Sequence, residues 1–131
     1  MDYQTLMNRR GIEEEIRQLE RDIARKEVEA NSATSVLSHS PRAPSISNDK
    51  VARLATELVY LRGELEKRMS ECDEIKRYIS SIENSSIRTA MRLYFIRGYG
   101  WRRVARETSY SKSGINKKVM AFLKKEDKVD T

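Results

Sequence analysis

A long apolar stripe runs through the middle of this 131-residue sequence. Apolar side chains recur there at alternating spacings of three and four, with one interruption at Arg68: Val51, Leu54, Leu58, Leu61, Leu65, Cys72, Ile75, Ile79 and Ile82. Such a repeat over nearly five heptads is typical of a helix with a coiled-coil seam. Asn48 or Asp49 can cap its start, so we expect a helix that ends near Glu83 and is roughly 50 Å long.

A second, thinner stripe precedes it. Ile12, Ile16, Leu19 and Ile23 predict a helix from residue 2 to about residue 30. Residues 31–48 are rich in serine and contain Pro41 and Pro44, so they predict a long loop. The simplest way to bury both stripes is a helical hairpin over residues 1–83. Because the first stripe is shorter, part of the second helix stays uncovered. This favours a homo-oligomer, with a dimer preferred; the alternative is a monomeric hairpin with an exposed seam.

The net charge of +6 is unevenly distributed along the chain. Residues 86–131 hold 12 Lys and Arg against 4 Asp and Glu, a net charge of +8, whereas residues 1–85 carry −2. A basic C-terminal block on a near-neutral body indicates a local anionic partner. Cys72 is the single cysteine and lies on the apolar stripe, so we expect it in the core. The lack of a disulfide and of a signal peptide indicates a cytoplasmic protein.

The basic block predicts three short helices. Asn84, Ser85 and Ser86 break the heptad run and offer new caps for a helix over 86–97, which the stretch 98–100 ends with two glycines. A second helix over 101–108 is followed by a polar turn, and Ser111 is a suitable cap for the last helix. We therefore expect an all-α protein: a hairpin or coiled coil followed by a helix-turn-helix domain at 84–125 and a flexible tail at 126–131.

The outer faces of the last two helices carry the candidate DNA-binding residues. The 3.6-residue period turns Val104, Ala105, Ile115 and Val119 inward. Ser113, Asn116, Lys117 and Met120 then share the outer face of the last helix. Arginine and lysine contact phosphate or guanine, and asparagine can pair with adenine. The candidates are Arg102, Arg103, Arg106, Ser111, Lys112, Ser113, Asn116, Lys117 and Lys118.

An ordinary three-helix bundle with a solvated basic face would show a similar pattern. The charge asymmetry and the absence of acidic residues between Glu107 and Glu126 favour DNA binding over that alternative.

The block 86–123 resembles region 4 of bacterial sigma factors. The likeness lies in residues 87–98 (IRTAMRLYFIRG), 101–105 (WRRVA) and 110–115 (YSKSGI). It is closer still to small phage and prophage proteins with such a C-terminus, including the ArpU- and RinA-type late transcription regulators. The resemblance implies a recognition helix at 111–120, a supporting helix at 101–108 and a role in activating phage late genes. Thr108, Ser109 and Gly114 stand where that family usually has leucine, glycine and threonine, so a left-handed residue at Ser109 would be strained.

We therefore expect a phage-encoded, sequence-specific transcription regulator that binds double-stranded DNA in the bacterial cytoplasm and contacts host RNA polymerase through its coiled coil. A small terminase-like DNA-packaging subunit and a coiled-coil protein-interaction module are the alternatives. The sequence offers no phosphate-binding loop and no catalytic set, so we expect no enzyme. It predicts no cofactor and no metal, because His39 stands alone. It also predicts no membrane partner, because no apolar run approaches 20 residues.

Overall fold

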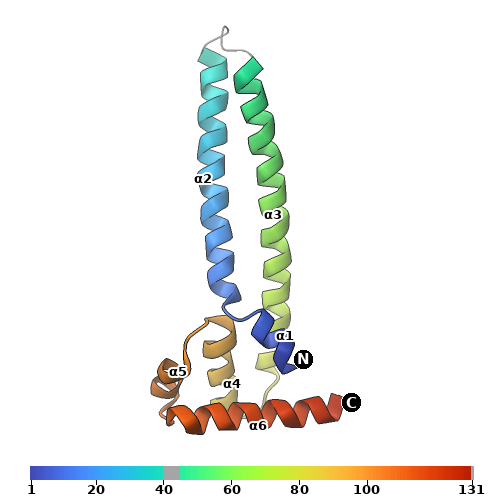
Figure 1. The fold of residues 1–131 in the computed structure, drawn as a ribbon, viewed down its shortest axis with the longest axis vertical. Coiled ribbons are helices and arrows are strands. Elements are labelled where there is room, and N and C mark those ends of the chain that lie inside the picture. Colours follow the sequence, from blue (N-terminus) through green and yellow to red (C-terminus); the bar gives the residue numbers. More distant parts are fainter. Residues whose placement is uncertain (40–44, 131) are drawn as a thin grey trace. The chain divides into compact units, whose positions relative to one another are not determined.

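All regular secondary structure is helical in the part of the chain that the structure, a computed structural model, describes: the backbone of residues 1–39 and 45–130, and the side chains of residues 1–32 and 49–127 (Figure 1). The elements are α1 (Tyr3–Asn8), α2 (Ile12–His39), α3 (Ser45–Ser80), α4 (Ser85–Met91), the π-helical turn η1 (Arg92–Ile96), α5 (Trp101–Thr108) and α6 (Lys112–Asp130). No strand occurs among these residues, so the predicted all-α class is confirmed. The chain divides into two compact units: Ile16–Arg68, and Met1–Glu15 together with Met69–Thr131.

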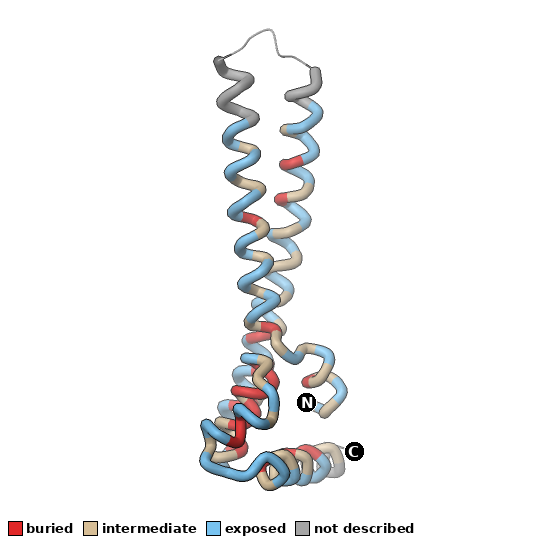
Figure 2. Tube along the Cα trace, turned by 60° about the vertical axis from the view of Figure 1, so that its left-hand side comes forward, coloured by how far each residue is buried: buried red, intermediate tan, exposed pale blue. Residues whose placement is uncertain are grey.

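Within the unit Ile16–Arg68, α2 and α3 run antiparallel beside one another (Figures 1 and 2). Ile23, Leu54 and Leu58 are buried, as the apolar stripes predict. Two ion pairs link the helices: Lys26 Nζ lies 2.9 Å from Glu57 Oε2, and Arg62 Nη2 lies 2.9 Å from Glu27 Oε1. The Glu57 carboxylate, through its hydrogen bond and its charge, raises the pKa of Lys26. Val28, Val59 and Tyr60 remain mostly exposed in this unit.

Three predicted helix ends were wrong. Helix α2 continues to His39 and α3 begins at Ser45, so the expected loop at 31–48 is too long. Each Ser, Thr or Asn costs a helix only a few tenths of a kcal/mol, and a helix once nucleated extends readily. Pro41 and Pro44 lie outside the described residues. At the C-terminus, α6 reaches Asp130 instead of ending before residue 126, because residues 115–130 contain no glycine or proline that would end the helix.

The N-terminal helix is also interrupted, where the sequence predicted one helix from residue 2. Asp2 caps the start of α1: its carboxylate accepts a hydrogen bond from Thr5 N at 2.9 Å. The hydrogen bonds between Asp2 and Thr5 lower the pKa of the Asp2 carboxyl. Gly11 then adopts a left-handed conformation with φ of +79°, and α2 begins after it. A glycine has no Cβ to oppose that conformation, so the break falls at the glycine.

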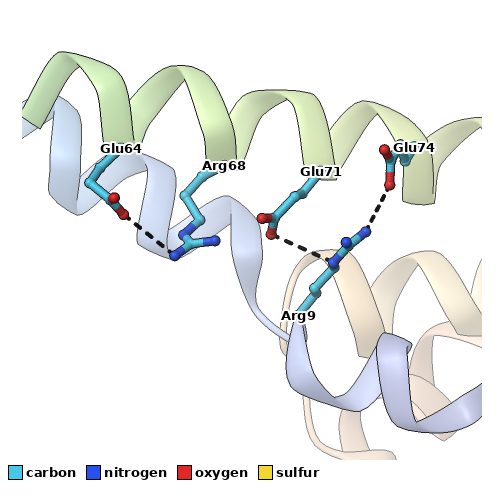
Figure 3. Close-up of polar contacts among 5 residues, drawn as sticks. All are labelled: Arg9, Glu64, Arg68, Glu71 and Glu74. Carbon is cyan, nitrogen blue, oxygen red and sulfur yellow. Dashed lines mark hydrogen bonds and ion pairs between the residues drawn. The ribbon is translucent and has the colours of Figure 1, made fainter.

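The second unit has its core around α4, η1, α5 and α6, and Figure 2 shows many buried positions in this part of the chain. Asn84 caps α4 by accepting a hydrogen bond from Ile87 N, as predicted. Buried residues of α1 and of the end of α3 belong to the same unit: Leu6, Cys72, Ile75 and Ile79. Figure 3 shows that Arg9 pairs with Glu71 and Glu74 of α3, at 3.5 and 2.9 Å; the same view draws the Arg68–Glu64 pair within α3. Residues 1–15 and 69–83 therefore group with the C-terminal segment, whereas the sequence placed a boundary at residue 83.

Candidate nucleic-acid interface

Helix α5 presents its arginines to solvent. Val104 and Ala105 are buried, whereas Arg102, Arg103 and Arg106 are exposed, as the helical period predicts. The ring of Trp101, the first residue of α5, stacks on Tyr94 with centroids 4.0 Å apart and planes 18° apart. Helix α5 is thus fixed to the core by its apolar side and its first turn, which leaves three guanidinium groups on its outer side.

A short turn joins α5 to α6. Ser109 takes a left-handed conformation with φ of +61° at the C-terminus of α5. The Thr108 hydroxyl donates a hydrogen bond to Val104 O at 2.7 Å, and Tyr110 N donates to Ala105 O at 3.1 Å. Ala105 O also accepts a hydrogen bond from Ser109 N, so these bonds hold the turn to the last turn of α5.

The Ser111 side chain caps α6, as predicted. Its Oγ accepts a hydrogen bond from Gly114 N at 3.0 Å. A Cβ atom on Gly114 would lie only 2.7 Å from that Oγ, so the glycine makes room for the cap. This contact explains physically why a glycine is compatible with the first turn of α6.

Helix α6 places most of its predicted contact residues at the surface. Lys112, Ser113 and Lys117 are exposed and Asn116 is half-buried, while Ile115 and Val119 are buried. Met120, which was expected on the same outer face, instead borders a cavity of about 430 Å³ lined also by Tyr3, Leu123, Lys124 and Asp127. The outer face of α6 is therefore narrower than the sequence predicted.

Lys118 differs from the other candidate cations. Its Nζ donates a hydrogen bond to the Tyr110 hydroxyl at 2.9 Å and lies 4.9 Å from the centre of that ring. The Tyr110 hydroxyl in turn donates to Ser86 Oγ at 3.3 Å. The hydrogen bonds with Lys118 and Ser86 and the charge of Lys118 lower the pKa of Tyr110. Lys118 thus holds the turn against α6, and the Tyr110 hydroxyl holds the turn against α4.

The contribution of Arg10 to this region was not predicted from the sequence. Its guanidinium donates hydrogen bonds to three carbonyls of the segment that leads into α5, those of Tyr94, Gly98 and Tyr99. The Tyr99 ring lies beneath the guanidinium of Arg103, 3.6 Å from its centre. The glycine after Arg9 and Arg10 is a signal for the helix break, but nothing local indicates where these arginines bind.

The remaining chemistry of the described residues is sparse. Among them, no group of three His, Cys, Asp or Glu side chains could hold a metal ion. None of their helices is both long and apolar enough to cross a membrane. No protein-family model, curated protein or solved structure matches the chain.

Proposed function

We propose that this protein is a transcription regulator that binds double-stranded DNA, with α5, the turn at 109–111 and α6 acting as a helix-turn-helix. The observation that carries the proposal is the exposure of five cations on two helices joined by a short capped turn: Arg102, Arg103, Arg106, Lys112 and Lys117. The resemblance of residues 86–123 to sigma factor region 4 and to phage late regulators supports a role at phage late promoters in the bacterial cytoplasm.

The proposed contacts divide by chemistry. The N-terminal half of α6 enters the major groove, where Asn116 pairs with an adenine and Lys112 or Lys117 with guanine or phosphate. Ser111 and Ser113, at the start of α6, donate to phosphate or base edges. The three arginines of α5 contact the phosphate backbone on the flank of the groove. Lys118 contributes through the Tyr110 turn rather than through a free ammonium group, because its Nζ is already bonded there.

We further propose that two copies associate through the helical hairpin formed by α2 and α3. The support is that Val28, Val59 and Tyr60 are 65, 70 and 66 % exposed in that unit, since exposed apolar residues favour association. A dimer would recognise half-sites about 34 Å apart or at a multiple of that distance, and the hairpin would contact RNA polymerase. Light scattering tests the alternative of a terminase-like packaging subunit: a dimer or tetramer supports regulation, and a large ring supports packaging.

The decisive experiment measures DNA binding against salt concentration. Duplexes selected from a random pool are labelled, and binding of the full chain is followed by fluorescence anisotropy between about 50 and 200 mM salt. The test variant combines Lys112→Ala, Asn116→Ala and Lys117→Ala. The control combines Gln18→Ala, Lys50→Ala and Lys67→Ala, which removes the same charge from exposed positions of α2 and α3.

We expect the test variant to bind more weakly and its log–log salt slope to fall by about 2, because each lysine contact with phosphate contributes about 1 to the slope. The control variant should bind like the wild type. Failure of the wild type to bind any selected duplex at about 100 mM salt would refute DNA binding. Equal affinity of both variants would move the interface away from α6 and favour a protein-interaction module.

A further inference from the structure

The residues that precede α2 bind the segment that precedes α5. Arg10 Nε donates to Tyr94 O at 3.2 Å, and its Nη2 donates to Gly98 O at 3.2 Å and to Tyr99 O at 2.9 Å. The Arg10 guanidinium also lies 4.1 Å from the centre of the Tyr94 ring. A planar guanidinium is suited to this combination of several carbonyls and one aromatic ring, whereas an ammonium group is not.

The backbone of Gly11 completes the same contact. Gly11 N donates to Phe95 O at 2.8 Å. Arg10 and Gly11, which we call the N-terminal hook, therefore satisfy four carbonyls at and after the end of η1. The last carbonyls of a helix have no partners within it, and a cation is favoured at a helix C-terminus by the helix dipole. The N-terminal hook thus supplies the hydrogen-bond donors and the positive charge that this helix end lacks.

The carbonyls that the hook binds belong to the residues that orient α5. Tyr99 offers its carbonyl to Arg10 and its ring to Arg103, whose guanidinium lies 3.6 Å from the ring centre. Tyr94 offers its carbonyl and ring to Arg10, and the same ring stacks on Trp101. Arg10 is therefore two contacts away both from the first residue of α5 and from an exposed arginine of the candidate interface.

We propose that Arg10 is a positioning residue for the DNA-binding face of α5: it holds Tyr94 and Tyr99 in the arrangement that orients Trp101 and Arg103. This inference rests on the proposed function, because the orientation of Arg103 matters for binding only when Arg103 contacts a DNA phosphate. It makes the N-terminal hook part of the binding unit, although 89 residues separate Arg10 from Tyr99 in sequence.

The first test needs no DNA. Trp101 is the only tryptophan of the chain, so its emission reports on the start of α5. Arg10→Met should shift the Trp101 emission while far-UV circular dichroism stays helical, and Arg21→Met, which removes an exposed arginine of α2, should leave the emission unchanged. If Arg10→Met does not fold, Arg10→Lys replaces it and should give a smaller shift in the same direction. Unchanged emission in the folded Arg10 variant would overturn the positioning role.

The second test is a double-mutant cycle on DNA binding by the full chain, with Arg10→Met and Arg103→Met singly and together. We expect each single variant to weaken binding by about tenfold and the double variant to bind hardly more weakly than either. Tyr99→Leu, which removes the ring beneath Arg103, should weaken binding similarly. If the two losses of affinity are additive, and Arg10→Lys binds DNA as tightly as the wild type, Arg10 contacts phosphate directly. That result would overturn the inference. A wild type that binds no DNA would refute the proposed function alone, because the emission test would still decide the orientation of α5.

Discussion

Gly11 and Gly98 meet backbone to backbone. Both are left-handed, with φ of +79° and +76°, and a Cβ atom on Gly98 would lie 3.1 Å from the Gly11 Cα. One glycine ends the break between α1 and α2, and the other follows η1. The close approach of these two backbone segments brings Gly11 N to Phe95 O and Arg10 to the carbonyls beyond it. Two glycines 87 positions apart in the sequence thus share one structural requirement.

Gly98→Ala should destabilise the protein. The added methyl group would be strained by the left-handed backbone, at about 1–2 kcal/mol, and would also press on the Gly11 backbone, which cannot move aside as a side chain can. We expect the free energy of unfolding in urea to fall by about 2–3 kcal/mol. Gly11→Ala should cost less, because its Cβ would lie at an ordinary 3.9 Å from the Gly98 Cα. Equal costs at the two positions would contradict the close contact.

Gly63→Ala should have the opposite effect. Gly63 lies inside α3, has no positive φ, and a Cβ there would meet no atom within 4 Å. Alanine in a helix interior is favoured over glycine by about 1 kcal/mol, so the melting temperature should rise. The same glycine-to-alanine change that lowers stability at Gly98 should therefore raise stability at Gly63. A melting temperature that falls would show that this face of α3 is less open than the structure indicates.

The parts of the fold that could be predicted are those that local patterns determine. Val104 and Ala105 are buried and Arg102 is exposed because a helical period fixes which side chains share a face. Ser111 caps α6 because a serine hydroxyl can reach an amide two or three residues later. These relations need only a few neighbouring residues, and the sequence displays them directly.

The parts that could not be predicted depend on distant partners or on weak propensities. Nothing near Arg10 indicates that its partners lie beyond residue 93. Likewise, Lys118 resembles any solvated lysine until the turn brings Tyr110 to it. The extent of α2 through residues 31–39 was missed for a different reason, because serine and threonine disfavour a helix too weakly to end it. Pro41 and Pro44, which follow that stretch, made the predicted loop begin too early.

Ser109→Gly should stabilise the protein. Ser109 is exposed and carries the left-handed backbone at the C-terminus of α5, with φ of +61°. Removing its Cβ relieves the strain, and the gain is partly offset by the greater freedom of glycine in the unfolded chain. We expect a net gain of about 0.5–1 kcal/mol in chemical denaturation. Ser109→Ala keeps the Cβ and serves as the control: it should give no gain, and a gain equal to that of glycine would exclude backbone strain as the cause.

Cys72 should react slowly with thiol reagents while the protein is folded. Its side chain is 3 % exposed, and burial raises the pKa of the thiol above its ordinary value of 9.0. The neutral thiol is therefore favoured in the folded state, a contribution to stability that is present below pH 9 and is lost as the pH rises through the raised pKa. When Cys72 reacts with a disulfide reagent that releases a coloured thiol, the colour at pH 8 should develop slowly without urea and fast in urea. Above pH 9, the unfolding free energy of the wild type should fall more steeply than that of Cys72→Ala, and parallel pH profiles would contradict a buried neutral thiol.

Ser111 and Gly114 should act non-additively on stability. Ser111→Ala alone removes the cap of α6 and should cost about 1 kcal/mol. Gly114→Ala alone should change little, because a gain in helix propensity of about 1 kcal/mol is offset when its Cβ, 2.7 Å from Ser111 Oγ, displaces the capping hydroxyl. Once Ser111→Ala has removed that hydroxyl, Gly114→Ala should stabilise by the full amount of about 1 kcal/mol. A double-mutant cycle by urea denaturation measures the difference, with Gly63→Ala as the control that gives the same gain in both backgrounds. If Gly114→Ala also gains equally in both, the side chain of Ser111 does not depend on the space that Gly114 leaves.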